Sequence, residues 1–150
     1  MNKYTTVALA AVLGLTLAAL AEDDDDAKPA KPAPPAVSAG QLPPVATNSP
    51  VLYATDIKPI LDSSCADCHS GSRAKGRLHL DTLAGVLQGG KEGKIVTVGD
   101  SAKSLLVLSV AHLTKDNEDW MPPLKNKEGI KPLLPAEISL IRAWIDQGAK

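Results

Sequence analysis

The feature that most constrains the fold is a five-residue motif, Cys65-Ala66-Asp67-Cys68-His69, which uses both cysteines of the 150-residue chain. Two thiols at this spacing, followed directly by a histidine, form the attachment motif for c-type haem. The thiols reach two vinyl groups along one edge of the porphyrin, and His69 then lies beneath its plane as an iron ligand. The chain has no Phe, so a large apolar macrocycle would supply core area that aromatic side chains usually provide.

Other uses of a C-x-x-C pair are disfavoured by the surrounding sequence. A thioredoxin-like redox pair needs a preceding strand within a βαβ unit, whereas the residues before Cys65 have helical periodicity. A structural zinc site needs four ligands, commonly from two such pairs, and His79 and His112 stand at no recognised finger spacing. A simple disulfide between Cys65 and Cys68 is the third alternative. Covalent haem is the favoured interpretation.

The second axial iron ligand is predicted to be Met121, within residues 120–123. Pro122 disfavours helical conformation at Met121, and the two consecutive prolines make a stiff strap that can hold a thioether over the porphyrin. A lone Met usually fills core space, and it is the haem motif that favours ligation here. His79 and His112 are the competing distal ligands, and an open sixth position is the remaining alternative. A Met thioether raises the reduction potential relative to bis-His ligation.

The first 49 residues are expected to lie outside the folded domain. Residues 1–21 combine a basic start, an apolar run and an A-x-A site ending at Ala21, which indicates a cleavable export signal. The apolar run is shorter than the ~20 residues of a membrane-spanning helix, so no permanent span is expected. Residues 22–49 join an acidic block to a Pro/Ala-rich stretch, a composition typical of a flexible linker. The domain is expected over residues 50–150, in the periplasm.

The spacing of apolar residues within this domain is helical. Four of them share one helix face before the motif: Tyr53, Ile57, Ile60 and Leu61. Asp56 is expected to cap this helix, or Pro59 to kink it. Further helices are predicted over residues 82–88, from residue 100 or 101 to His112, and over residues 135–148. No segment has the two-residue period of a strand, so the domain is predicted to be all-α.

These residues resemble the planctomycete cytochrome C domain, a small domain of the class I, His/Met cytochrome c type. The matching segments cover most of residues 53–149: 56–61, 76–82, 89–90, 98–100, 104–106, 121–123 and 144–149. The resemblance implies a class I cytochrome c-like helical globule whose first and last helices pack together across one covalent haem.

By the same resemblance, Cys65 and Cys68 carry the thioether bonds. His69 is the proximal and Met121 the distal iron ligand. The family usually has a proline where this chain has Val98, which leaves open which backbone carbonyl orients the His69 ring.

The predicted function is transfer of single electrons between redox partner proteins, without enzymatic activity. The alternative is a haem enzyme or gas sensor in which Met121 is displaced by a ligand. A formal net charge of −1 argues against nucleic acid as a partner. Three cations follow the motif closely: Arg73, Lys75 and Arg77. They either surround the exposed haem edge and steer an acidic redox partner, or form an ordinary solvated loop.

Overall fold

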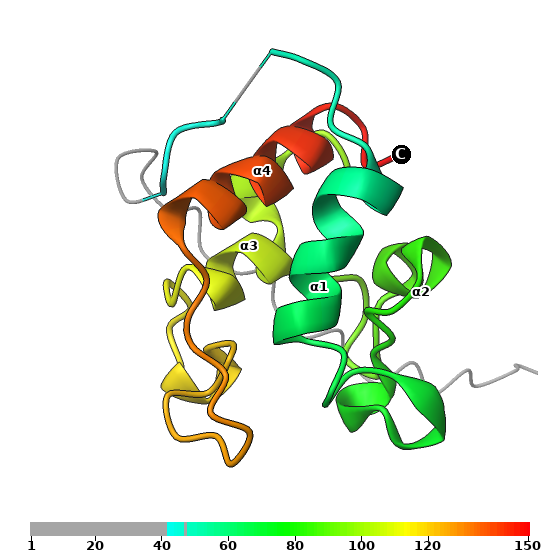
Figure 1. The fold of residues 1–150 in the computed structure, drawn as a ribbon, viewed down its shortest axis with the longest axis vertical. Coiled ribbons are helices and arrows are strands. Elements are labelled where there is room, and N and C mark those ends of the chain that lie inside the picture. The colour runs from blue at the N-terminus through cyan, green and yellow to red at the C-terminus, as the bar shows by residue number, and fades with distance from the viewer. Residues whose placement is uncertain (1–41, 47) are drawn as a thin grey trace, which may run out of the picture.

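The computed structural model describes residues 42–46 and 48–150, which form short helices and turns around one longer C-terminal helix (Figure 1). In chain order the elements are the π-helical turn η1 (Tyr53–Ile57), α1 (Lys58–Ser64), the 3-10 turns η2 (Gly71–Arg73) and η3 (Lys75–Arg77), α2 (Leu83–Gln88), the 3-10 turn η4 (Ser101–Lys103), α3 (Leu105–Val110), the 3-10 turn η5 (Asn117–Asp119) and α4 (Pro135–Asp146). These described ranges contain no strand, and the predicted all-α class is confirmed.

The expected export signal at residues 1–21 and the linker up to residue 41 lie outside the described residues. Within the described part, none of the helices is both long and apolar enough to cross a membrane.

The first helix begins as a wide π turn ahead of Pro59. Proline lacks an N–H and clashes with the carbonyl four residues earlier in a regular helix. In η1 the Lys58 N–H bonds instead to the Tyr53 carbonyl, and this longer spacing accommodates the proline in the first turn of α1. Of the two alternatives for this helix, the cap at Asp56 is wrong, because Asp56 lies inside η1. Its Oδ2 accepts the Leu52 N–H at 2.7 Å, so the helix begins earlier than expected.

The ends of α2 and α4 agree with the prediction because local side chains fix them. Thr82 caps α2 by accepting the Gly85 N–H at 3.1 Å. At the start of α4, Glu137 Oε2 accepts the Leu134 N–H at 2.7 Å, and Gly148 follows the helix with a φ of 102°. Such a left-handed conformation favours glycine.

The single helix expected from residue 100 to His112 is split into two pieces. Asp100 caps η4 by accepting the Lys103 N–H at 3.1 Å, and α3 starts separately at Leu105. The Ser104 hydroxyl donates to the Asp100 carbonyl at 3.0 Å, a local bond that competes with a continuous helix. His112 lies beyond the end of α3, with a φ of 55°.

The core lies where α4 packs against the first helix and α3. Trp144 on α4 is fully buried, and its ring lies 5.8 Å from that of Tyr53, centroid to centroid. The indole N–H donates to the Lys150 carbonyl at 2.9 Å. The first and last helices therefore pack together, as the resemblance implied.

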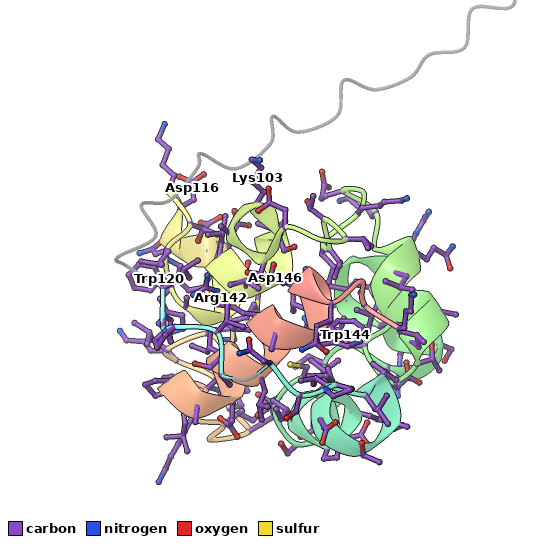
Figure 2. All side chains as sticks on the ribbon, turned by 90° about the horizontal axis from the view of Figure 1, so that it is seen from above. Lys103, Asp116, Trp120, Arg142, Trp144 and Asp146 are labelled. Carbon is purple, nitrogen blue, oxygen red and sulfur yellow. The ribbon has the colours of Figure 1, made fainter. Side chains whose placement is uncertain are left out.

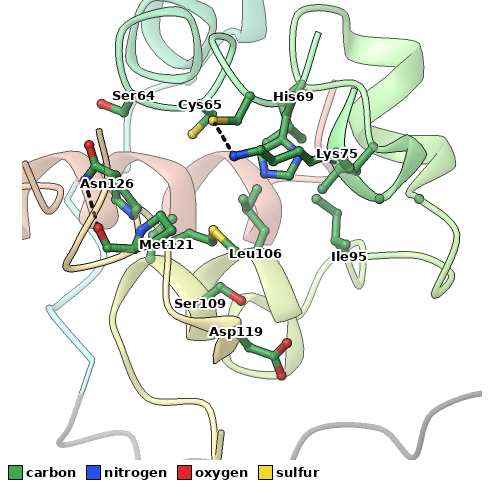
Figure 3. A pocket seen from close by; sticks show the side chains of 18 of the residues that line it. Ser64, Cys65, His69, Lys75, Ile95, Leu106, Ser109, Asp119, Met121 and Asn126 are labelled. Atoms are coloured by element: carbon green, nitrogen blue, oxygen red, sulfur yellow. Dashed lines mark hydrogen bonds between the residues drawn. The ribbon is translucent and has the colours of Figure 1, made fainter. Parts of the chain in front are cut away.

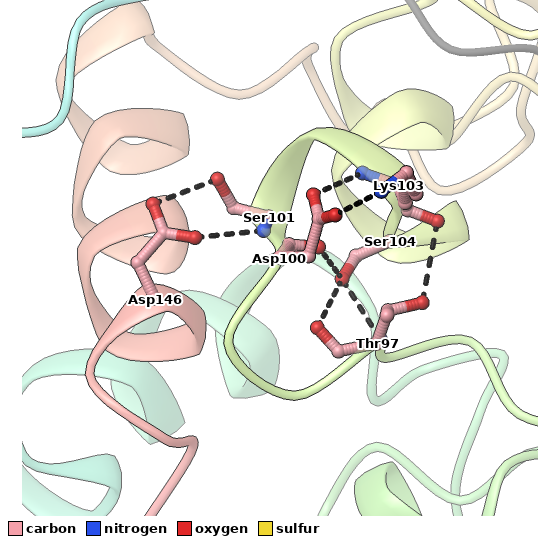
Figure 4. Close-up of polar contacts among 6 residues, drawn as sticks. All are labelled: Thr97, Asp100, Ser101, Lys103, Ser104 and Asp146. Atoms are coloured by element: carbon pink, nitrogen blue, oxygen red, sulfur yellow. Dashed lines mark hydrogen bonds and ion pairs between the residues drawn. The ribbon is translucent and has the colours of Figure 1, made fainter.

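A cluster of polar residues, in which Ser101 and Arg142 are buried, joins α4 to η4 and to the chain before residue 50. Asp146 accepts both the N–H and the hydroxyl of Ser101, at 2.7 and 2.9 Å (Figure 4). Arg142, which also projects from α4 (Figure 2), donates to the Ser101 hydroxyl at 3.2 Å and to the Pro43 carbonyl. Leu42 is only 5% exposed. Packing contacts therefore extend back to Leu42.

Candidate functional site

A cavity of about 720 Å³ opens between two walls of the domain (Figure 3). The first wall comprises the end of α1, the C-x-x-C-H motif and parts of the chain up to Ile95. The second comprises α3 and residues 119–130, which we call the strap. Aliphatic side chains cover much of the interior: Leu78, Leu80, Ile95, Leu105, Leu106, Val110 and Ile130. The volume is in the range of about 300–1,000 Å³ that is typical of ligand and cofactor sites.

The predicted site residues all line this cavity: Cys65, Cys68, His69 and Met121. The first three come from one wall, whereas Met121 reaches in from the strap (Figure 3). Both cysteines are free thiols, and burial raises the pKa of Cys65 to about 12, with a smaller contribution from Cys68. Two thiols, an imidazole and a thioether around an apolar cavity are the donor set that a covalently bound haem requires.

The backbone of the motif continues from the end of α1. The Cys65 N–H bonds to the Leu61 carbonyl at 2.8 Å, and the His69 N–H bonds to the Cys65 carbonyl at 2.9 Å. The His69 carbonyl in turn accepts the Leu80 N–H at 2.8 Å. These bonds fix the backbone of residues 65–69 at both ends. The two thiols and the imidazole are therefore held on the same wall of the cavity.

Lys75 contacts the motif in three ways. Its carbonyl lies 3.1 Å from His69 Nδ1, which leaves Nε2 of the ring for a metal. Its N–H donates to the Cys68 carbonyl at 2.9 Å, and its Nζ donates to Cys68 Sγ at 3.3 Å (Figure 3). The carbonyl that orients His69 is thus that of Lys75. Val98 is exposed and is not among the residues that line the cavity.

Burial lowers the pKa of His69. The Lys75 and Leu78 backbones oppose that shift, and the Lys75 charge adds to it. A lowered pKa favours the neutral imidazole, which is the form that binds a metal.

The competing histidines are not among the residues that line the cavity. His79 Nδ1 lies 3.9 Å from an Asp81 carboxylate oxygen. The His112 ring stacks on Trp120, with centroids 5.0 Å apart and planes 2° from parallel. In this arrangement Met121 is the candidate distal ligand that faces the cavity.

Of the three cations that follow the motif, Lys75 lines the cavity, whereas Arg73 and Arg77 are exposed on the same loop. The structure adds three lysines that the sequence analysis missed: Lys91, Lys125 and Lys127. Three acidic residues also line it: Glu92, Asp119 and Glu128. The missed lysines are distant from the motif in sequence, and only the fold brings them to the same opening.

Asn126 is another lining residue to which the sequence analysis gave no role. The available signal was its place in the polar stretch that follows the two prolines after Met121.

Comparison with known families identifies a match to this chain. The family model described as planctomycete cytochrome C matches residues 65–125, a stretch that begins at Cys65 and includes Met121. The resemblance seen in the sequence is thereby confirmed over these residues, and it implies a haem-containing protein. No curated protein and no solved structure matches the chain.

Proposed function

Because residues 65–125 match the family model of planctomycete cytochrome C, we propose that this protein is a periplasmic electron carrier with one covalently attached haem. The proposal rests on a single observation: Cys65, Cys68 and His69 line one wall of an apolar cavity that Met121 enters from the other. When bound, haem supplies an iron that changes between ferric and ferrous states and so holds one electron. Export to the periplasm is supported by the signal-like sequence of residues 1–21.

Each residue of the site has a distinct part in this proposal. Cys65 and Cys68 would hold the haem by thioether bonds, and Nε2 of His69 would be the proximal ligand. The Lys75 carbonyl keeps the His69 ring oriented through Nδ1, which also raises the basicity of the ligating nitrogen. Met121 would be the distal ligand, and the aliphatic side chains exclude water from the iron environment.

Met121 is what favours a carrier over an enzyme or sensor. A thioether in the sixth position leaves no site for oxygen or peroxide, so the chemistry is limited to outer-sphere electron transfer. Met ligation also stabilises ferrous iron relative to bis-His ligation and raises the reduction potential. The lining of the cavity by Met121, and not by His79 or His112, supports His/Met over bis-His ligation.

The decisive experiment is absorption spectroscopy of the protein exported together with a c-type haem maturation system. We expect haem that stays on the chain through denaturing electrophoresis, and a weak red band from ferric iron–thioether ligation. Met121→Ala should abolish that band, whereas His79→Ala and His112→Ala should retain it. Loss of the band in His112→Ala, with Met121→Ala unaffected, would reverse the ligand assignment.

Two other results would overturn larger parts of the proposal. Absence of covalent haem, with Cys65→Ser and Cys68→Ser indistinguishable from the wild type, would remove the cofactor itself. Immediate binding of carbon monoxide by the ferrous wild type would show an open sixth position and favour the enzyme or sensor alternative.

The proposed redox partner is acidic. Lysines from both walls meet at the opening of the cavity: Lys75, Lys91, Lys125 and Lys127. Arg73 and Arg77 add positive charge on the same loop as Lys75, against Asp67 of the motif and the acidic Glu92, Asp119 and Glu128. A positive excess around an electron-transfer site raises the encounter rate with a negatively charged partner.

Small redox reagents test the sign of this charge without a known partner. Oxidation of the ferrous protein by anionic ferricyanide should slow as ionic strength rises, because salt screens attraction. The double variant Lys125→Glu/Lys127→Glu should slow this oxidation at low salt and reduce its salt dependence. The control is a pair of exposed lysines that do not line the cavity, Lys58→Glu and Lys103→Glu. This pair should change the oxidation rate and its salt dependence less. Equal effects of the two pairs would mean that only net charge matters.

A further inference from the structure

Asn126 joins the two ends of the strap segment that follows Met121. Its side-chain amide donates to the Pro123 carbonyl and to the Ile130 carbonyl, each at 2.8 Å, and its Oδ1 accepts the Ile130 N–H at 2.7 Å. One side chain thus bridges residues 123 and 130. Asn126 is half-buried, whereas Leu124, Lys125 and residues 127–129 are exposed.

The strap needs such a bridge because its own backbone supplies little. In the described part of the chain, residues 122–130 make no hydrogen bond between backbone groups other than in the turn at Lys127 and Glu128. Pro122 and Pro123 have no N–H to donate. The Asn126 amide therefore does for this segment what backbone hydrogen bonds do in a regular turn.

The other end of the strap is fixed at Met121 itself. The Met121 N–H donates to the Ser109 carbonyl in α3 at 3.0 Å. Trp120 stacks on His112 and donates through its indole N–H to the Thr114 carbonyl at 3.4 Å. On the N-terminal side, the hydrogen bond to Ser109 in α3 holds the Met121 backbone. On the C-terminal side, after Pro122 and Pro123, the Asn126 side chain holds the strap.

From this arrangement we propose that Asn126 is a positioning residue, which restrains the strap and so keeps the Met121 thioether over the iron. This inference rests on the proposed function, because it assigns Met121 as the distal ligand. Asn126 touches neither the iron nor the thioether in this role. Its three hydrogen bonds restrain the conformation of residues 123–130 of the strap, and so limit how readily an external ligand displaces Met121.

The test compares three variants of the exported, haem-loaded full chain. Asn126→Ala removes all three bonds. Asn126→Asp keeps the acceptor for the Ile130 N–H but loses both amide donors. Asn117→Ala is the matched control, since Asn117 lies in η5 near the strap, is exposed, and makes no side-chain bond to it.

The first measurement is the affinity of ferric protein for imidazole, which competes with Met121. We expect Asn126→Ala to bind imidazole about tenfold more tightly than the wild type, which corresponds to ~1.4 kcal/mol. Asn126→Asp should show a gain at least as large, because a carboxylate oxygen would face the Pro123 and Ile130 carbonyl oxygens that the amide now bonds. Asn117→Ala should show none. Equal imidazole affinity in Asn126→Ala and the wild type would overturn the positioning role.

The second measurement is independent of iron ligation. Trypsin cleaves after exposed lysines, and the strap carries Lys125 and Lys127 on either side of Asn126. Cleavage there should be faster in Asn126→Ala than in Asn117→Ala, because the segment opens more often. Unchanged cleavage would contradict the restraint itself.

The two measurements separate this inference from the proposed function. If the wild type lacks the iron–thioether band, Met121 is not the distal ligand and the proposed function fails in that respect, whatever trypsin shows. If the band is present but Asn126→Ala changes neither readout, only the role of Asn126 fails.

Discussion

At the scale of single residues, Lys75 contributes more than the sequence could indicate. Its charge and its position after the motif left two interpretations open, a place at the haem edge or an ordinary solvated loop, and in the structure it lines the cavity. Its carbonyl contact with His69 was not predictable, because every residue has a carbonyl and only the path of the chain decides which one faces the ring. Gly76, with a φ of 63°, helps to set that path, since this conformation favours glycine.

The thiols of the haem-free chain should differ in reactivity. Cys65 is buried, and its pKa is raised to about 12 by burial and by Cys68, whereas Cys68 is half-exposed. Because the thiolate is the nucleophile, we expect iodoacetamide at pH 8 to alkylate Cys68 well before Cys65, as read by mass spectrometry of the peptides. Equal rates in the folded chain would contradict this, and equal rates in urea are the control.

The same shift has a defined consequence for stability. The folded chain favours the protonated Cys65 thiol, so this contribution is complete below the unfolded pKa of about 8.5 and is lost as pH rises through the folded value of about 12. Unfolding by urea should therefore become easier in this alkaline range, and less so in Cys65→Ser. A pH dependence that is identical in both proteins would show that Cys65 does not cause it.

At the scale of elements, the sequence predicted helix ends where a side chain or a proline fixes them. Thr82 and Pro135 begin α2 and α4 as expected. The cap considered at Asp56 and the continuous helix expected over η4–α3 were wrong, for different reasons. Asp56 has the chemistry of a cap but bonds backward to Leu52, and the Ser104 hydroxyl interrupts a helix that the apolar periodicity alone would extend. Such competition between local bonds and periodicity depends on the tertiary contacts.

Gly85 in α2 provides a test in which packing opposes helix propensity. In a helix interior Ala is favoured over Gly by roughly 0.5–1 kcal/mol. A Cβ at position 85, however, would lie 2.5 Å from the His79 carbonyl oxygen and 2.7 Å from His79 Cβ. We expect Gly85→Ala to lower the free energy of unfolding by about 1–3 kcal/mol, measured by urea titration. The control Ala84→Ser, on the exposed side of α2, should change the free energy of unfolding by ~0.5 kcal/mol or less. If Gly85→Ala instead raises the free energy of unfolding, the His79 backbone must move away from the added Cβ.

At the scale of the whole molecule, the all-α class followed from the absence of two-residue periodicity and from the motif. The resemblance added the packing of the first and last helices. The cavity was not predictable in shape, because its second wall is the irregular strap, whose path depends on single contacts such as Met121 to Ser109. The polar cluster of Arg142, Ser101 and Asp146 was also missed, since Ser101 is far in sequence from the other two.

The packing of residues before position 50 can be tested in the full chain. Leu42 is 5% exposed, whereas Val45 in the same segment is 44% exposed. We expect Leu42→Ala to lower the free energy of unfolding by about 2 kcal/mol, and Val45→Ala to change it by ~0.5 kcal/mol or less. Thermal unfolding of the two variants, compared in the same haem state, distinguishes them. Indistinguishable variants would mean that the segment adds no stability to the domain.

The cavity between the two walls also has a consequence for the lifetime of the protein in a cell. Proteases attack chains in proportion to how often they open, and a ligand that binds only the folded state reduces that opening. This domain has few aromatic side chains and a cavity of about 720 Å³. The ligand that fills the cavity should therefore contribute much of the stability of the folded state. If haem is the ligand, as proposed, we expect the steady-state amount of this protein in the cell to rise and fall with haem supply, as measured by immunoblot.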